Sequence, residues 1–159
     1  PHSLDRLELR ICDFISNIDL LLAITAFLEL RVISLFDHLE SLDPLSSSKF
    51  SLDELKDICD QNELKVSKDS LNAELIHWKD GEKIICKDWI QNLLNDLSIS
   101  SRSLAMNHFL EPIHKVLKEG NESMKWIDKY KQGLSVEDIM RSAIYNMIKN
   151  EEENNLWFK

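Results

Sequence analysis

The chain has 159 residues, of which 43% are hydrophobic and 30% are charged, a composition that is ordinary for a globular protein and sufficient for a buried core. Its formal net charge of −9 disfavours nucleic acid and anionic membrane surfaces as general partners, and no basic cluster offsets it locally. Cys12, Cys59 and Cys86 lie far apart without metal-binding spacing, which is typical of reduced thiols in a cytoplasmic protein.

Residues 6–12 alternate between polar and apolar side chains, which is the pattern of a half-buried strand. Arg6, Glu8, Arg10 and Cys12 would share one face of this strand. Side chains two residues apart lie roughly 7 Å from each other on that face, so a cation and the carboxylate of Glu8 could reach one bound anion together. The simpler interpretation of the pattern alone is an amphipathic edge strand whose charges are solvated.

Residues 14–40 are predicted to hold one long helix that begins at Asn17 or Ser16, either of which can cap it. Apolar residues surround most of its circumference, which predicts a central and largely buried helix. Charged residues such as Asp19 and Glu29 interrupt the apolar run too early for a membrane span.

Residues 51–73 are predicted to form short helices after a polar loop. Ser51 and Glu54 have the spacing of a capping box, which marks a helix that would run to about Gln61. A second short helix is predicted over residues 68–71.

Residues 74–86 give a strong hairpin signal, because two short apolar runs flank the dipeptide Asp80-Gly81. This dipeptide predicts a two-residue type I′ turn. Two strands alone are only marginally stable, so the hairpin is expected to lie on helices or to pair with the strand at 6–12.

Residues 87–153 are predicted to form the C-terminal helices. Pro112 falls inside one of them, so we expect a kink or a helix that restarts near Glu111. Asn121 and Ser135 are the predicted caps of the last two helices, and the last one carries a regular apolar stripe.

Together these elements predict one mainly α (α+β) domain over residues 1–159, with about six to seven helices, a strand within 1–13 and one hairpin. The strand needs partners that the chain can barely supply. We therefore expect a fragment of a larger α+β fold that lacks its N-terminal part.

Two further constellations are weaker. His108, Glu111 and His114 follow helical spacing, but a di-metal bundle needs a second such helix, which favours ordinary solvated or hydrogen-bonded histidines. Ser46 and Lys49 have the spacing of a Ser–Lys nucleophile pair, but they lie in a serine-rich stretch that reads as a linker.

Residues 1–13, followed by a long apolar helix, resemble the late strand of the glutamate–cysteine ligases, in particular the cyanobacterial and plant-like branch and the related carboxylate–amine ligases. In that family a strand reads hydrophobic-Glu-hydrophobic-Arg, with an Asp three residues further on. Glu8, Arg10 and Asp13 match these positions, although a helix-entry cap is the favoured role for Asp13. The resemblance is best over residues 1–37.

The resemblance implies an enzyme that joins the γ-carboxylate of glutamate to the amine of cysteine, the first step of glutathione biosynthesis, with ATP, Mg²⁺ and an acyl phosphate intermediate. It implies that Glu8 is a metal ligand and that Arg10 is a catalytic residue at the transferred phosphoryl group. Arg6 shares their face and is a further candidate for binding ATP, without a family counterpart. These residue types suit the roles, since Mg²⁺ takes hard oxygen ligands and guanidinium binds phosphate oxygens.

The family's other metal carboxylates and its substrate-binding residues come earlier in the chain, and no Gly-rich phosphate loop is present here. The fragment alone is therefore expected to be inactive and to bind neither ATP nor Mg²⁺, and its partner is the missing N-terminal part of the same enzyme. Two alternatives stay open. One is a non-catalytic helical interaction or regulatory module, and the other is a related carboxylate–amine ligase with a different amine substrate.

Overall fold

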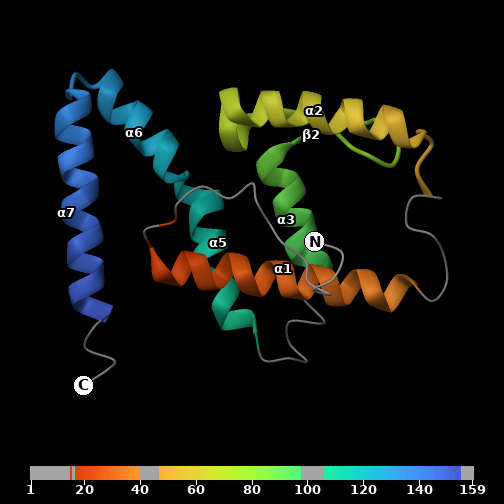
Figure 1. Cartoon of the computed structure of the whole chain (residues 1–159), viewed down its shortest axis with the longest axis horizontal. Coiled ribbons are helices and arrows are strands. Elements are labelled where there is room, and N and C mark those ends of the chain that lie inside the picture. The colour runs from red at the N-terminus through yellow and green to blue at the C-terminus, as the bar shows by residue number, and fades with distance from the viewer. Residues whose placement is uncertain (1–14, 16, 40–46, 98–105, 155–159) are drawn as a thin grey trace, which may run out of the picture.

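The computed structural model describes residues 15, 17–39, 47–97 and 106–154, and it shows the mainly helical chain that the sequence predicts (Figure 1). The predicted strand at 1–13 lies outside these residues. None of the helices in the described part combines the length and hydropathy that a membrane crossing requires. The elements in chain order are α1 (Ile18–Leu39), α2 (Leu52–Asp69), the 3₁₀ turn η2 (Ser70–Asn72), β1 (Glu74–Ile76), β2 (Lys83–Ile85), α3 (Cys86–Asp96), α5 (Asn107–Glu119), α6 (Glu122–Lys131) and α7 (Val136–Asn154).

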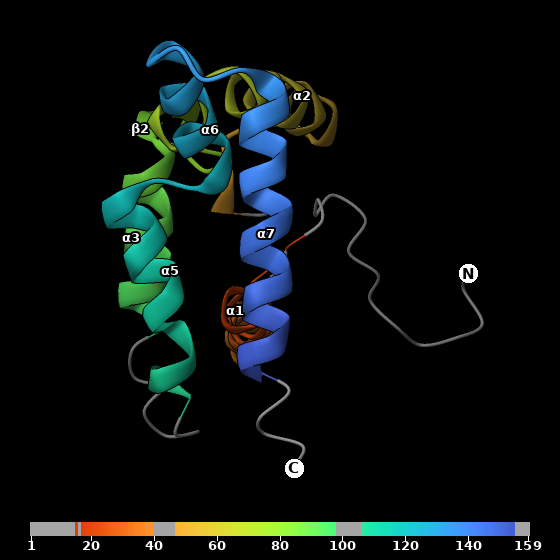
Figure 2. The same ribbon diagram turned by 90° about the vertical axis from the view of Figure 1, so that its left-hand side faces the viewer.

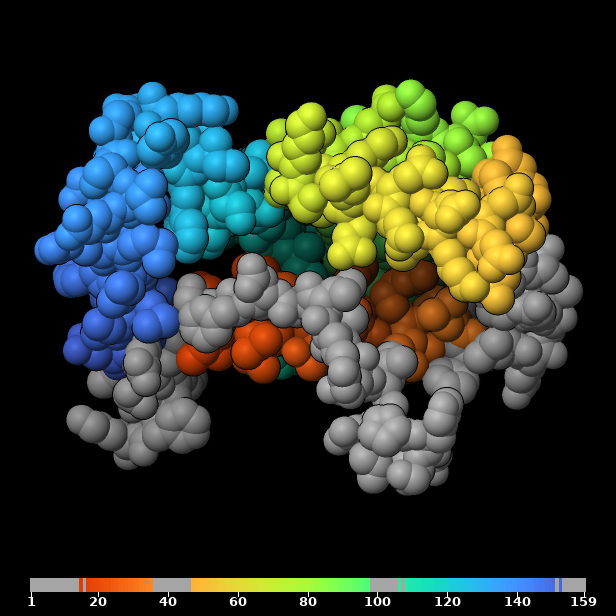
Figure 3. Space-filling model, turned by 45° about the horizontal axis from the view of Figure 1, so that its top comes forward, coloured from red at the N-terminus to blue at the C-terminus, as the bar shows by residue number. Residues whose placement is uncertain are grey.

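Helix α1 runs along one edge of the molecule, and α3 and α5 lead away from it (Figure 1). Figure 2 looks along α1 and shows α3 and α5 together on one side of it. Helix α2 and the hairpin lie at the far end of α3, whereas α6 and α7 extend from α5 to the opposite end of the molecule. Figure 3 shows these two groups at the two ends of one face, with α1 along its edge.

Helix α1 begins at the predicted cap, because the backbone N–H of Leu20 donates to Oδ1 of Asn17 over 2.8 Å. Its buried side chains pack against α3 and α5 in a first core cluster, which consists of Ala23, Ala26, Leu30, Leu94, Leu97, Leu110 and Ile113. Other apolar residues of α1 are exposed, for example Leu21 at 46% and Leu22 at 48%. The prediction of a largely buried helix is therefore wrong for its described side chains, since among the described residues only one face of α1 packs against other helices.

Helix α2 starts at the predicted capping box. The Glu54 N–H donates to the hydroxyl of Ser51 over 3.4 Å, and the Ser51 N–H donates to the Glu54 carboxylate over 2.7 Å. The helix then continues for 18 residues to Asp69, so the prediction of two short helices is wrong. The second half of α2 buries no apolar face, and Leu64 there is exposed to solvent at 73%. An exposed helix segment needs no apolar side chains at helical spacing, so the sequence gives no periodic signal for it.

The predicted hairpin is present, with β1 and β2 antiparallel and Leu75 opposite Ile84. Its turn differs from the prediction. The His77 N–H donates to the Glu82 carbonyl over 2.8 Å, so the loop holds four residues, 78–81, and not two. Gly81 closes it at φ +76°, a left-handed conformation that suits glycine.

A second core cluster joins the hairpin to the helices. Its buried members are Leu71, Ala73, Leu75 and Cys86. Ile90 of α3 and Leu117 of α5 pack against both this cluster and the first one. The two clusters therefore form one continuous apolar interior through these two side chains.

Helix α5 runs without interruption through Pro112, so the predicted restart near Glu111 does not occur. The helix ends at Gly120, whose φ is +84°. The predicted caps of the next two helices are confirmed, since Asn121 accepts from the Met124 N–H over 3.0 Å and Ser135 accepts from the Asp138 N–H over 3.1 Å.

The apolar stripe of α7 has little cover in the described structure. Ile139 is 5% exposed, whereas Val136 is 64%, Ile144 is 50% and Ile148 is 47% exposed. Helix α7 contacts mainly α6. The regular apolar spacing thus predicts correctly that α7 is a helix, but it does not show whether the apolar face of this helix is buried.

Candidate functional site

The residues that the sequence assigns to ligase chemistry lie outside the described residues. These are Arg6, Glu8 and Arg10, with Asp13 at the end of the same segment. The structure describes the helix that follows them, α1, which core contacts of Ala23 and Leu30 hold against α3 and α5. The site prediction therefore stays a prediction.

The weaker constellations do not assemble a site. In the described ranges, no group of three or more His, Cys, Asp or Glu side chains could hold a metal ion. His108 and His114 are exposed, and the His108 ring lies 3.9 Å from that of Phe109, centroid to centroid. Lys49 lies with its Nζ 5.2 Å from the ring centroid of Phe50, and Ser46 is outside the described residues.

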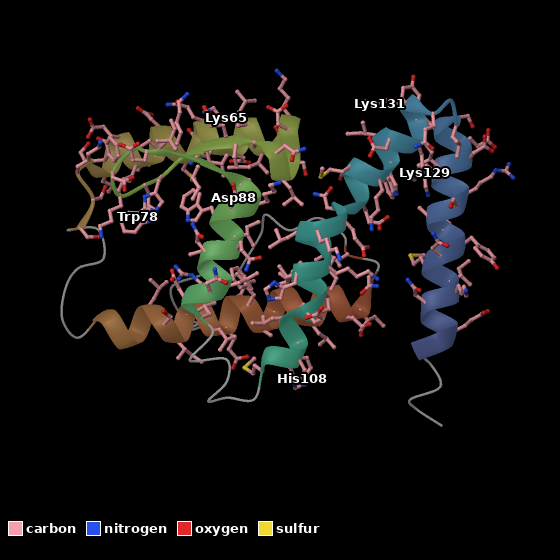
Figure 4. The ribbon with its side chains drawn as sticks, turned by 180° about the vertical axis from the view of Figure 1, so that it is seen from behind. Lys65, Trp78, Asp88, His108, Lys129 and Lys131 are labelled. Carbon is pink, nitrogen blue, oxygen red and sulfur yellow. The ribbon has the colours of Figure 1, made fainter. Side chains whose placement is uncertain are left out.

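The structure instead brings α1, the hairpin loop and α3 together around a cleft of about 540 Å³, here called the Arg31 cleft. It combines cationic, aromatic and amide side chains. Trp78 lies on the hairpin loop above the C-terminal half of α1 in Figure 4. The lining residues are Arg31, His77, Trp78, Lys79, Ile84, Trp89, Asn92, Leu93, Asn95 and Asp96.

Hydrogen bonds hold the hairpin loop on one side of the Arg31 cleft. The Ser48 hydroxyl donates to the Trp78 carbonyl over 2.8 Å, and the Lys49 N–H donates to the Lys79 carbonyl over 3.0 Å. The loop is therefore tied to the chain that leads into α2, and its side chains face the cleft from a supported backbone.

Asp80 organises the tip of the same loop. Its Oδ1 lies 3.0 Å from Nδ1 of His77 and accepts the Glu82 N–H over 3.1 Å. The backbone hydrogen bond from Glu82, followed by the interaction with His77, lowers the pKa of Asp80 below its usual value. The carboxylate thereby orients the His77 ring, which lies 5.1 Å from the ring of Trp89 and 6.0 Å from that of Trp78.

A smaller hollow of about 210 Å³ lies between η2, α5 and α6. Three lysines line it, Lys87, Lys118 and Lys125, but Glu119 and Asp128 line it as well. Lys125 also lies 3.8 Å from the Glu122 carboxylate. The positive charge is therefore matched locally, and the Arg31 cleft is the larger of these two hollows.

Sequence reasoning did not find the Arg31 cleft. None of the residues that line the cleft belongs to a catalytic or metal-binding motif that the sequence analysis singled out. The one local signal is the adjacent pair His77-Trp78 at the hairpin loop, where small and polar turn residues are the usual occupants. The packing of α1, α3 and α5 in the first core cluster places Arg31 around the same cleft as this pair.

Comparison with curated proteins and with solved structures gave no significant match. The family model for glutamate-cysteine ligase family 2 (GCS2) matches residues 1–149. This match spans the segment that carries Glu8 and Arg10 and extends into α7. The chain belongs to glutamate-cysteine ligase family 2.

Proposed function

We propose that this chain supplies the phosphoryl-transfer strand of an ATP-dependent ligase that joins glutamate to cysteine. Membership of the family supports a ligase-type activity, and the family match includes the segment with Glu8 and Arg10. The single observation that carries the proposal is this match together with the hydrophobic-Glu-hydrophobic-Arg pattern at residues 7–10.

The chemistry explains why these residue types are needed. A carboxylate becomes reactive toward an amine only when one of its oxygens is a leaving group. The γ-carboxylate oxygen of glutamate attacks the terminal phosphorus of ATP and ADP leaves. The cysteine amine then attacks the acyl phosphate and phosphate leaves, with loss of a proton. In the proposal, the guanidinium of Arg10 binds the transferred phosphoryl group and stabilises its charge.

Glu8 offers the hard oxygen that Mg²⁺ prefers, and the ion would neutralise charge on the phosphates. Mg²⁺ demands octahedral coordination, which one carboxylate cannot complete. No cluster of metal-binding side chains exists among the described residues to supply more ligands. We therefore propose that another part of the enzyme provides them together with the glutamate-binding and cysteine-binding residues, and that this chain alone is inactive.

We also assign the reaction to the cytoplasm. Cys59 and Cys86 are both free thiols in the structure, which suits a reducing compartment. The assignment concerns the complete enzyme and is tested by fractionation of the source cells.

The test of Arg10 is ATP turnover by the complete enzyme with glutamate, with and without cysteine. Arg10→Ala is expected to lower kcat by at least about a hundredfold, the scale for removal of one charge-stabilising donor. Arg141→Ala is the matched control, because Arg141 is an exposed arginine of α7 that pairs with Glu137 over 2.7 Å. Unchanged turnover of Arg10→Ala would contradict the assigned role.

The test of Glu8 is the Mg²⁺ concentration that gives half-maximal turnover. Glu8→Gln keeps the size of the side chain and removes its charge, so the required concentration is expected to rise. An unshifted Mg²⁺ dependence counts against metal ligation. Glutamate-dependent turnover that requires a different amine would assign the chain to the related carboxylate–amine ligases instead.

A further inference from the structure

We propose that the Arg31 cleft binds a small organic anion that carries a flat ring, as a site separate from the ligase residues. The proposal uses only described side chains and is independent of the proposed function. Three features carry it: an unpaired cation, two flanking indoles and a matching charge balance.

The first feature is Arg31. Its side chain is half-buried, and it forms no hydrogen bond or ion pair within the described structure. No buried side-chain nitrogen or oxygen in the described structure lacks a hydrogen-bond partner, so the Arg31 guanidinium is open to solvent in the cleft, and its planar fork of donors suits a carboxylate or a phosphate. Lys79 lines the same cleft from the hairpin loop and adds a second cation. An anion between them would accept hydrogen bonds from both cations.

The second feature is the pair of half-buried indoles, Trp78 and Trp89, with the His77 ring between them at 6.0 Å and 5.1 Å. Half-buried tryptophans usually donate their indole N–H, yet neither indole forms a hydrogen bond in the described structure. Their faces offer stacking to a ring, and their N–H groups offer donors to its polar substituents. The cleft therefore recognises more than a bare anion.

The third feature limits the ligand's size and charge. The volume of about 540 Å³ lies within the range of roughly 300–1,000 Å³ that is typical of small-molecule sites. The cleft lining contains two cations, Arg31 and Lys79, and one carboxylate, Asp96. This balance favours a ligand with one carboxylate or one phosphate monoester and disfavours a polyphosphate. The ligand class is thus distinct from ATP.

The probe is phenyl phosphate, which combines a ring with one phosphate, and it is titrated into the full 159-residue chain. Isothermal titration calorimetry is expected to show saturable binding at least tenfold tighter than that of inorganic phosphate, of phenol or of ATP. In ¹H–¹⁵N spectra, the indole N–H signals of Trp78 and Trp89 should shift on titration. The signal of Trp126, on α6, should stay in place and serves as the internal reference.

Two variants separate the parts of the site. Arg31→Gln removes the cation and Trp78→Leu removes one indole, and each is expected to weaken phenyl phosphate binding at least tenfold. Arg141→Gln is the control and should bind like the unaltered chain, because Arg141 lies on α7 away from the cleft. Circular dichroism melting verifies that each variant folds. Lys79→Gln, at an exposed position, replaces Arg31→Gln if that variant does not fold.

Three results would overturn the proposal. They are the absence of saturable phenyl phosphate binding, equal affinity for inorganic phosphate, and unchanged affinity in the folded Arg31→Gln variant or its replacement. None of these results bears on the ligase proposal, since no ATP turnover is measured.

Discussion

The side-chain amide of Asn62 forms two hydrogen bonds with the backbone of Ile76, accepting from its N–H over 2.8 Å and donating to its carbonyl over 2.9 Å. In the antiparallel ladder the pair His77–Glu82 is hydrogen-bonded, so the polar backbone groups of Ile76 point away from β2. Asn62 thus takes the place that a third strand would fill on the outer edge of β1. A strand from residues 6–12 cannot pair with Ile76 unless Asn62 leaves.

Asn62→Ala is expected to lower the free energy of unfolding by about 1–3 kcal/mol, because it leaves the partly buried N–H and carbonyl of Ile76 without partners. Urea denaturation followed by circular dichroism measures the loss. Gln61→Ala, at the neighbouring exposed position of α2, is the control and should stay within about 0.5 kcal/mol. Equal stabilities of the two variants would show that the amide contributes nothing.

Gly81 and Gly133 form a natural pair for separating backbone strain from a steric clash. Both have a positive φ, +76° and +97°. A Cβ at Gly81 would lie 2.8 Å from Cζ of Phe50, whereas a Cβ at Gly133 would have no neighbour within 4 Å. Both Ala variants are expected to lose about 1–2 kcal/mol from left-handed backbone strain. Gly81→Ala should lose about 1–3 kcal/mol more from overpacking.

The measurement for this pair is again urea denaturation. Phe50→Leu removes the Cζ atom, so in that background the difference between Gly81→Ala and Gly133→Ala should narrow. A difference that is unchanged by Phe50→Leu would place the extra cost elsewhere in the loop.

The capping box makes stability depend on pH through Glu54. Ser51 donates two hydrogen bonds to the Glu54 carboxylate, and both lower the pKa of this carboxyl below its usual value of 4.5. The bond from the Ser51 backbone N–H has the larger effect, and the bond from the hydroxyl has the smaller one. A carboxyl whose pKa is lower in the folded state stabilises the fold above the unfolded pKa, and this contribution is lost as pH falls through the folded pKa. The difference in melting temperature between the unaltered chain and Glu54→Gln should therefore shrink as pH falls below 4.5.

Ser51→Ala is the informative comparison for this pH dependence. It removes the hydroxyl, so the chain should lose about 1 kcal/mol of stability from the weakened cap. It keeps the Ser51 backbone N–H, the larger cause of the shift, so part of the pH dependence should remain. If the melting temperature of Ser51→Ala showed no pH dependence attributable to Glu54, the backbone N–H of Ser51 would not be the larger cause of the lowered pKa.

The two described cysteines should react at different rates. Cys59 is exposed on α2, whereas Cys86 is buried and its burial raises the pKa of its thiol. In a Cys12→Ser background, Ellman's reagent at mildly alkaline pH should modify Cys59 at least about tenfold faster than Cys86, because the thiolate is the nucleophile. Cys59→Ser should remove the fast phase, and a surviving fast phase would mean that Cys86 is accessible.

Local features were the ones that the sequence predicted well. The caps at Asn17, Ser51, Asn121 and Ser135 are all confirmed, because each depends on a side chain and a backbone N–H three residues away. The strands of the hairpin are also local. Its loop was misassigned, because Asp80-Gly81 alone does not reveal that His77 and Glu82 form the closing pair.

Features that depend on distant partners could not be predicted. Nothing in the neighbourhood of Asn62 signals that its amide covers a strand edge, and nothing near Arg31 signals a cleft shared with Trp78. The exposure of Leu21 and Leu22 follows from where α3 and α5 pack, which apolar periodicity does not encode. The ligase residues themselves stay a prediction, since Glu8 and Arg10 lie outside the described residues.

Ile90 and Leu117 each pack against both apolar clusters. The clusters are therefore expected to open together, at a higher free energy than a helix that packs against neither. Loosening either cluster withdraws packing from the other, so α1, the hairpin, α3 and α5 are expected to open as one cooperative unit. Helix α7 contributes no buried residue to either cluster and can detach while both stay closed. Amide hydrogens of α7 should therefore exchange with solvent long before those of α3.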